Sequence, residues 1–366
     1  MRGALFFAAL LASCSVALIN PPAPGAPGAP GAPGPPGTPS GPGGTAGDQQ
    51  QATQAPPPAD PAPRDANPPF EYWWHVTGKA ASSVLSPGRP FRNEVAFLYE
   101  HDAGLYPRIY NGRRENGGTP QEADLVAHLT ELRRDIQRDI PDPNFSGWAV
   151  LDYESWDPVW ELTKPEYREV SKELVLRNDP TRPASDVERL AKYLYESAAK
   201  RFMVDTIIEA KRVRPRAKWG YYALPWPTYA VHQQSTQWLW DVSDALFPCL
   251  YTFKEGLPPT APMIGPNQRE LSGYEADMRG RIILSKRFAP GKPVIALLWV
   301  RYDAVGTPLF GRFVNDGDLG AMLRIPKASG ADGAIFWNQA QSPDEAADLR
   351  RFLSEKLAPA LRNADE

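Results

Sequence analysis

The chain has 366 residues, of which 42% are hydrophobic and 11% aromatic, enough for one large folded domain with a sizeable core. Forty basic residues against 43 acidic ones give a formal net charge of -3. Because no basic run or stripe stands out, the sequence gives no support to nucleic-acid binding.

The first 18 residues have the pattern of a secretory signal peptide. Arg2 precedes an apolar stretch from Ala4 to Ala12, and small residues follow. Two processing sites are compatible with this stretch. One resembles the lipobox of bacterial lipoproteins, with Cys14 as the lipidated residue, and the other is a small-x-small cleavage site that ends at Ala17. We expect a secreted or cell-surface protein, attached to a membrane only if Cys14 carries a lipid.

Residues 19–69 are expected to form a disordered linker rich in proline, glycine and alanine. No aromatic residue occurs between Pro21 and Pro69, and glycine recurs at every third position from Gly25 to Gly37. This stretch resembles collagen, but the period fails at Ser40 and so few triplets do not hold a trimer together. An extended tether is the better interpretation.

From Phe70 onward, predicted strands and helices alternate. Helices are predicted to begin at Thr119 and at Ser185, each with a glutamate three residues later that completes a capping box, and a last helix is capped by Ser342. The helix from Ser185 runs toward Arg214, which precedes a proline. The predicted strands cover residues 70–74, 148–151, 218–222, 245–253, 293–300 and 333–337.

Strands separated by helical stretches predict a parallel α/β architecture. The length suits a single (β/α) barrel of the triosephosphate-isomerase type over residues 70–366. There is no Gly-x-Gly-x-x-Gly turn and no P-loop, so no nucleotide cofactor is expected. None of the four histidines lies at metal-pair spacing with another, so no metal site is predicted either.

Two carboxylates follow the apolar strand 148–151. Asp152 and Glu154 are two residues apart, so on an extended chain they point to the same side. At the carboxyl end of a barrel strand, acidic side chains face the catalytic mouth, where such a pair can perform acid/base chemistry on a sugar. On spacing alone, two solvated carboxylates at the start of a loop are the more ordinary interpretation.

Several segments, taken together, resemble the hyaluronidase family of glycoside hydrolases from about residue 70 to residue 361. In the family's order they are 70–76 (FEYWWHV), 104–107 (GLYP), 116–121 (NGGTPQ), 145–154 (FSGWAVLDYE), 219–222 (WGYY), 246–251 (LFPCLY) and 333–337 (GAIFW). Each match alone is weak, whereas the ordered set is specific.

The resemblance implies a distorted parallel barrel and an endo-β-N-acetylhexosaminidase that retains configuration. Glu154 would be the general acid and later the base. Asp152 would hold and polarise the acetamide of the substrate, whose carbonyl attacks the anomeric carbon. Tyr222 and Tyr251 would donate hydrogen bonds near the acetamide, and Trp337 would form a wall beneath it. Since two carboxylates this close repel each other, one pKa of the pair is raised, and activity at acidic pH is expected.

The resemblance also bears on the substrate. Tyr106 would flank the cleft. Asp157 stands where the family commonly has an arginine that can meet a uronate, and a carboxylate there would repel hyaluronan. A glycosaminoglycan-like polysaccharide, hyaluronan or chondroitin, is the expected substrate, and another N-acetylhexosamine glycan remains an alternative. A carbohydrate-binding barrel without turnover is the competing function, and no segment indicates a dedicated protein partner.

Overall fold

The computed structural model describes residues 69–84, 91, 92, 94–252 and 274–364. The predicted signal peptide, the lipidation candidate Cys14 and the linker up to residue 68 lie outside this range. So does Phe253, the end of one predicted strand. The fold begins at its first aromatic strand, β1 (Glu71–Thr77).

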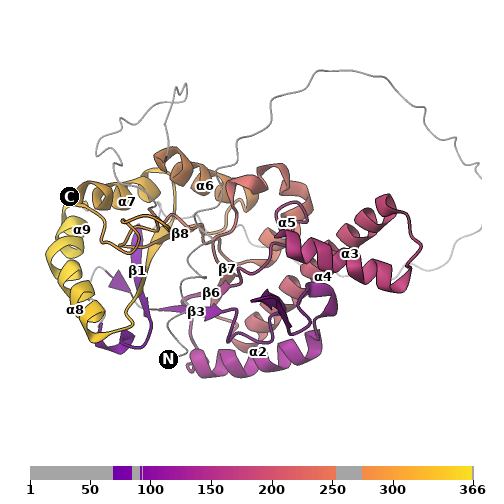
Figure 1. Cartoon of the computed structure of the whole chain (residues 1–366). Coiled ribbons are helices and arrows are strands. Elements are labelled where there is room, and N and C mark those ends of the chain that lie inside the picture. Colours follow the sequence, from indigo (N-terminus) through magenta and orange to yellow (C-terminus); the bar gives the residue numbers. More distant parts are fainter. Residues whose placement is uncertain (1–68, 85–90, 93, 253–273, 365–366) are drawn as a thin grey trace, which may run out of the picture. The chain divides into compact units, whose positions relative to one another are not determined.

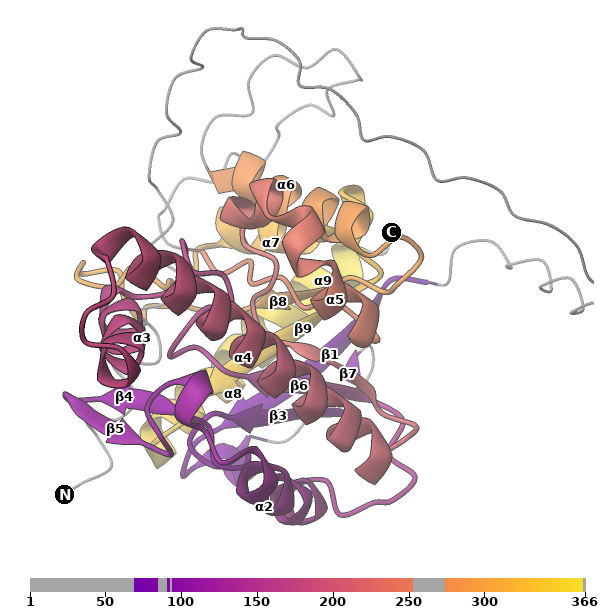
Figure 2. The same ribbon diagram turned by 90° about the vertical axis from the view of Figure 1, so that its right-hand side faces the viewer.

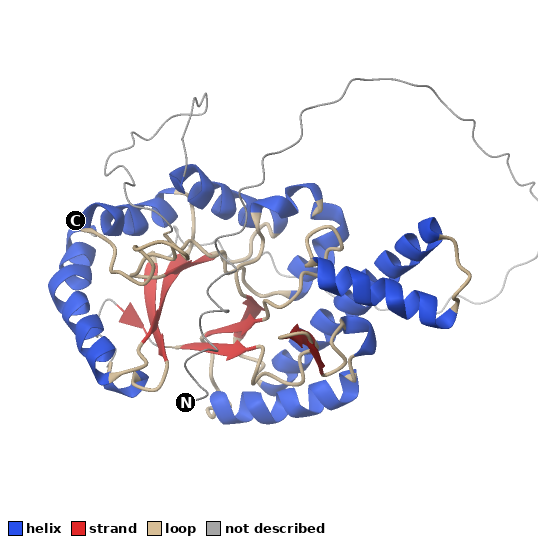
Figure 3. Cartoon of the chain, in the orientation of Figure 1, coloured by secondary structure: helices blue, strands red, loops and turns tan. Residues whose placement is uncertain are grey.

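Parallel strands make up two sheets (Figure 3). One sheet has the order β2-β1-β9-β8 and the other the order β3-β6-β7. Their bounds are β2 Phe91–Arg92, β3 Val95–Tyr99, β6 Trp148–Asp152, β7 Lys218–Tyr221, β8 Ile295–Leu298 and β9 Gly333–Gln339. A separate antiparallel hairpin joins β4 (Arg108–Tyr110) to β5 (Arg113–Glu115) and was not predicted.

Residues 245–251 connect the two sheets. Isolated parallel bridges pair Tyr222 with Phe247, Leu246 with Val294 and Cys249 with Leu297. The parallel segments therefore follow one another in chain order, β1, β3, β6, β7, 245–251, β8 and β9, as in a barrel of the triosephosphate-isomerase type. Within the described residues no ladder joins β3 to β1, and the Phe97 ring packs on His75 at 4.7 Å instead. The predicted fold class, a barrel-like α/β fold, is confirmed.

Helices surround the strands (Figures 1 and 2). They are α2 Leu125–Asp139, α3 Pro165–Asn178, α4 Ala184–Val213, α5 Gln233–Val242, α6 Tyr274–Phe288, α7 Asp316–Ala328, α8 Pro343–Phe352 and α9 Ala358–Ala364. Short 3-10 turns occur at Ala81–Ser83, Pro120–Glu122 and Pro227–Val231, and a π turn at Leu353–Leu357 joins α8 to α9. In the part of the chain that is described, no helix has the length and apolarity needed to cross a membrane.

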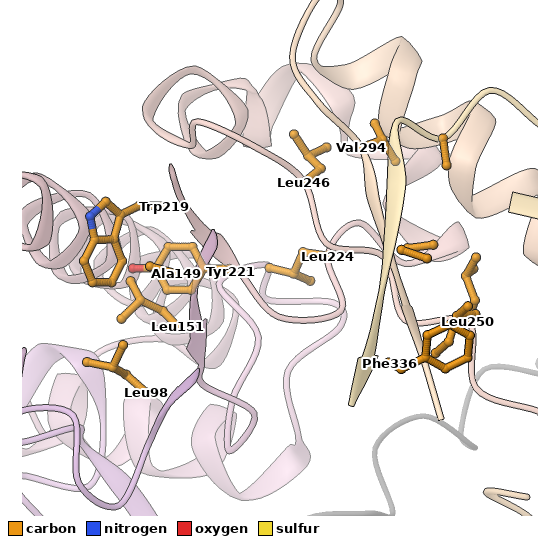
Figure 4. Packing of buried hydrophobic residues seen from close by; sticks show 14 of the residues in the cluster. Leu98, Ala149, Leu151, Trp219, Tyr221, Leu224, Leu246, Leu250, Val294 and Phe336 are labelled. Atoms are coloured by element: carbon orange, nitrogen blue, oxygen red, sulfur yellow. The ribbon is translucent and has the colours of Figure 1, made fainter. Parts of the chain in front are cut away.

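The outward faces of the strands pack on the helices. Leu98 of β3, Leu151 of β6 and both Trp219 and Tyr221 of β7 are buried and gather on one side of these strands (Figure 4). The inward faces are apolar as well, so each central strand is buried on both faces. This double burial explains why residues 148–151 form an uninterrupted apolar run.

The inward-facing side chains fill the barrel. They form a separate cluster that includes Trp73, Phe97, Val150, Phe247, Ile295, Leu297 and Ile335. Two glycines make room for the largest of them. A Cβ on Gly333 would lie 2.5 Å from Cζ3 of Trp73, and one on Gly220 would lie 2.8 Å from the Phe247 ring. The interior is thus packed below the level at which the strands end.

Two predicted elements differ in detail. Thr119 does not cap a helix, because Ala123 is extended and separates the Pro120–Glu122 turn from α2. Helix α2 begins instead after Asp124, whose carboxylate accepts a hydrogen bond from the Ala127 amide at 2.9 Å. Residues 245–251 form isolated bridges rather than a continuous strand. The Ser342 cap of α8 agrees with the prediction. Helix α4 is present as predicted, but its N-cap is Pro183 and no side chain caps it, so the capping box expected at Ser185 is not formed.

Candidate active site

On each strand, the side chains that point into the barrel alternate with those that point outward, and the inward-pointing set extends to the carboxyl end of the strand. Because side chains alternate, His75 follows Trp73 on β1 and Tyr99 follows Phe97 on β3. The same alternation carries the lining to a set of polar and aromatic residues above the packed interior, namely His75, Tyr99, Asp152, Tyr222, Tyr251, Trp299 and Trp337. This mouth is where we place the candidate active site.

Asp152 and Glu154 are brought together at the mouth. Asp152 is the last residue of β6, lies opposite Tyr99 in the ladder and is 5% exposed. Burial raises the pKa of Asp152 to about 7, a hydrogen bond with Glu154 lowers it in part, and the charge of Glu100 raises it further. The second oxygen, Oδ1, is buried without a hydrogen-bond partner among the described residues. It is therefore free to accept a hydrogen bond from a bound molecule.

The hydrogen bond between the two carboxyls requires a proton on one of them, because two carboxylates can only accept. Burial raises the pKa of Asp152 to about 7, so the pair retains a proton at acidic pH. The pair can therefore supply one proton to a bound molecule.

Glu100 is a buried carboxylate at the site that the sequence analysis missed. Its Oε2 accepts from the backbone amides of Glu154 at 3.0 Å and Ser155 at 2.9 Å. Its Oε1 accepts from Ser155 Oγ at 2.6 Å and from Arg108 Nη1 at 3.2 Å. The sequence did offer one sign of it, because Glu100 directly follows the apolar run 95–99. In the structure this run is strand β3, which pairs with β6, the strand that ends at Asp152.

Three aromatic rings form one wall of the mouth. The Tyr251 and Trp337 rings are stacked at 6.0 Å with an interplanar angle of 27°, and Trp299 meets Trp337 edge-on at 5.8 Å. Trp337 Nε1 donates to the Tyr99 hydroxyl at 2.9 Å, which fixes the indole. Trp299 was not predicted, although its alternation with Leu297 places it in the lining.

Tyr222 faces the carboxylate pair. It pairs with Phe247 just beyond β7, and its ring lies 6.5 Å from that of Tyr251. Burial raises its pKa well above the ordinary value, and the nearby Tyr251, Glu154 and Asp152 raise it further. Tyr222 therefore keeps its hydroxyl proton. The structure thus places Tyr222, Tyr251 and Trp337 together with the pair.

Tyr106 does not lie at the mouth. It is 1% exposed and packs on Trp156, with ring centroids 5.2 Å apart, and on Tyr153 at 4.3 Å. Tyr153 alternates with Asp152 and Glu154, so it points out of the barrel, where its hydroxyl donates to the Ala103 carbonyl. The expected place of Tyr106 beside the cleft is corrected to the outer core.

Asp157 is engaged within the protein. Both of its carboxylate oxygens accept from the Tyr229 hydroxyl at 2.9 Å, and one also accepts from the Val159 amide at 2.8 Å. Burial raises its pKa to about 7, and these two hydrogen bonds lower it in part. The expectation that this carboxylate repels hyaluronan stays a prediction, and in the structure its oxygens bind Tyr229 and its own loop.

Elsewhere in residues 69–364, as far as they are described, no three histidine, cysteine, aspartate or glutamate side chains are grouped to hold a metal ion. A cavity of about 580 Å³ lies between the Pro120–Glu122 turn, α3 and α4. None of its lining residues belongs to the carboxylate pair or the aromatic wall. The mouth is therefore the place where acid chemistry and aromatic surface coincide.

Known proteins resemble this chain in sequence and in fold. The sequence model of the family described as hyaluronidase matches residues 79–366. A chondroitin hydrolase from Caenorhabditis elegans is 29% identical over 299 residues, covering 74% of this chain and 62% of its own length. Hyaluronidase-1 from Homo sapiens is 30% identical over 304 residues, covering 76% of this chain and 67% of its own. The chain thus spans about two thirds of the length of these relatives.

Solved structures of bee venom hyaluronidase resemble this fold. Bee venom hyaluronidase has a TM-score of 0.68 and 27% identity, with 80% of this chain and 99% of that chain covered. The bee venom enzyme in complex with a hyaluronic acid tetramer has a TM-score of 0.67 at 27% identity, with 81% and 100% covered.

Proposed function

Because this chain belongs to the hyaluronidase family of glycoside hydrolases, we propose that it is an endo-acting N-acetylhexosaminidase for a glycosaminoglycan-like polysaccharide. The observation that carries the proposal is the hydrogen-bonded pair of Asp152 and Glu154 beside the stacked Tyr251 and Trp337. A proton shared by two hydrogen-bonded carboxyls is available for a leaving group.

In the proposed reaction Glu154 protonates the oxygen of the bond that breaks. Asp152 is hydrogen-bonded to Glu154, and its Oδ1, which has no partner among the described residues, can accept from the N–H of the substrate acetamide. The acetamide carbonyl then attacks the anomeric carbon, and no enzyme nucleophile is required. Glu154, now ionised, takes a proton from the water that opens the cyclic intermediate. Configuration is retained because the carbon is attacked twice.

The surrounding aromatic residues support this geometry. Tyr222 and Tyr251 keep their hydroxyl protons, since burial raises both pKa values well above the ordinary range. The Tyr251 hydroxyl can therefore donate to the acetamide oxygen as negative charge moves through it. The Tyr222 hydroxyl, which donates to Cys249 Sγ at 3.7 Å, can do so once it turns from the sulfur. The Trp337 indole, fixed by Tyr99, offers an apolar face to the acetamide methyl group.

Hyaluronan and chondroitin are the proposed substrates. The relatives that support this choice are named for both polymers, and one solved neighbour carries a hyaluronic acid tetramer. Burial raises the pKa of Asp157 to about 7, so at acidic pH this carboxyl is largely uncharged and does not repel a polyanion. Export through the signal peptide, with Cys14 as a possible lipid anchor, belongs to the same proposal.

The test is digestion of hyaluronan, chondroitin and chitin oligomers by the purified protein and by Glu154→Gln, at pH 4.5 and pH 7. Products are identified by mass spectrometry. Oligosaccharides from a uronate-containing polymer are expected with the wild type and with Glu166→Gln, an exposed control on α3. Turnover that survives Glu154→Gln refutes the mechanism. Binding of polymer without any product would favour the carbohydrate-binding alternative.

A further inference from the structure

The turn that carries Glu154 leaves the sheet and needs new hydrogen-bond partners. Strand β6 ends at Asp152, so the next backbone amides no longer pair with a neighbouring strand. A buried amide without a partner costs roughly 1–3 kcal/mol. The amides of Glu154 and Ser155 both donate to one oxygen of Glu100, which is 8% exposed.

Glu100 is itself held on three sides. Its backbone amide donates to the Asp152 carbonyl at 2.9 Å, which continues the ladder between β3 and β6. Its second carboxylate oxygen accepts from Ser155 Oγ and Arg108 Nη1. Arg108 is 11% exposed and also donates to Glu115 at 2.7 Å, so the β4–β5 hairpin fixes the guanidinium. Charge-assisted hydrogen bonds of this kind fix geometry more firmly than neutral ones.

We propose that Glu100 is a positioning residue, which fixes the backbone at Glu154 and Ser155 so that the Glu154 carboxyl stays against Asp152. The inference rests on the proposed function, in which Glu154 is the acid. Toward the site, the Glu100 carboxylate bonds to the backbone amides of Glu154 and Ser155 and to the Ser155 hydroxyl, so Glu100 acts through the turn and not on the substrate.

The charge of Glu100 has a second effect on the pair. It is one of the causes that raise the pKa of Asp152. The charged and titratable groups that face or sense Glu100 are Arg108, Asp152, Tyr106, Tyr153 and Tyr167. Arg108 keeps its charge and the tyrosines stay neutral at acidic pH, so Asp152 is the one of these groups whose ionisation responds. Loss of the Glu100 charge therefore lowers the pKa of Asp152 and moves the pH–rate profile toward acid.

The test compares Glu100→Gln and Glu100→Asp with the wild-type chain. The matched control is Glu115→Gln, which removes the other carboxylate on Arg108 and leaves Glu100 in place. With Glu100→Gln, kcat should fall about 10- to 100-fold with KM within about 2-fold, the range for a small misplacement of a catalytic group. Its pH profile should shift toward acid. Glu100→Asp keeps the charge, so its kcat should fall while its pH profile stays in place.

Amide hydrogen exchange without substrate provides a readout that does not depend on activity. The amides of Glu154 and Ser155 should exchange about 10-fold faster or more in Glu100→Gln, and at the wild-type rate in Glu115→Gln. If Glu100→Gln does not fold, Ser155→Ala removes one bond to Glu100 and should lower kcat about 2- to 5-fold.

Two results would overturn the inference. One is unchanged exchange at both amides in Glu100→Gln. The other is a variant that melts earlier but turns over at the wild-type kcat and pH profile, which describes a purely structural ion pair. A wild-type protein that cleaves no glycan would instead remove the proposed function, while faster exchange would still establish Glu100 as the anchor of the turn.

Discussion

Replacing Asp152 with asparagine should stabilise the folded protein at alkaline pH while removing most of its activity. The side chain is 5% exposed, and burial raises its pKa from an ordinary 3.8 to about 7. Above pH 7 the Asp152 carboxylate is therefore charged and buried in the folded protein, whereas in the unfolded chain the same charge is hydrated. This difference destabilises the folded state. Asparagine has the same shape without the charge and can still accept from Glu154.

The sign and size follow from proton linkage. Between pH 3.8 and about 7 the folded state binds a proton that the unfolded state has lost, so wild-type stability falls as pH rises through this window. At about 1.4 kcal/mol per pH unit, the full window corresponds to about 4 kcal/mol above pH 7 and only about 1 kcal/mol at pH 4.5. The gain from Asp152→Asn should then be larger at pH 8 than at pH 4.5 by about 1–3 kcal/mol, since relaxation takes up part of the difference.

Urea unfolding of both proteins at pH 4.5 and pH 8 measures this gain. Asp142→Asn, at an exposed position, supplies the baseline for an aspartate change that removes no buried charge. Hydrolysis by Asp152→Asn should fall by about 10²- to 10⁴-fold. A variant less stable than the wild type at pH 8, or equally stabilised at both pH values, would refute the conclusion that the buried charge of Asp152 destabilises the folded protein.

Two further changes test the loop and the barrel interior. Asp157→Asn should keep hydrolysis, because the Asp157 carboxylate binds Tyr229. It should also raise the free energy of unfolding by an amount that grows from pH 5 to pH 8, since burial raises the pKa of Asp157 to about 7. A large loss of kcat would show that Asp157 contacts the substrate. Gly220→Ala places a Cβ 2.3 Å from the Ala245 carbonyl oxygen and should cost about 2 kcal/mol or more in urea unfolding. Gly280→Ala, with no atom within 4 Å of its new Cβ, is the control, and an equal cost for both would exclude the steric explanation.

The sequence could predict those parts of the site that depend on local periodicity. An apolar run followed by Asp152 and Glu154 requires only the two-residue alternation of a strand to bring both side chains to one face. Tyr222, Tyr251 and Trp337 were placed through the resemblance, and the structure gathers them at the same mouth. Strand order in a parallel barrel follows chain order, so the fold class was also within reach.

The sequence could not predict contacts that depend on which segments become neighbours. Glu100 bonds to residues 54 and 55 positions away, across the ladder between β3 and β6. Tyr106 lies on a loop whose sequence has no hydrophobic periodicity, so no local pattern indicated that its ring packs on Tyr153 outside the barrel. Thr119 and Glu122 fit the pattern of a capping box, yet Ala123 is extended and ends that turn, so Asp124 caps the helix instead.

The packed barrel interior has a consequence for how the acid exchanges its proton. Trp73 and Phe247 pack against Gly333 and Gly220 in the buried cluster that fills the barrel, so we expect water to reach Asp152 and Glu154 through the mouth. A polysaccharide lying across that mouth would complete the enclosure, and the substrate itself would serve as the lid. Each turnover would then start with the proton that was on the pair when the polymer bound, and the water that opens the cyclic intermediate would return a proton to Glu154.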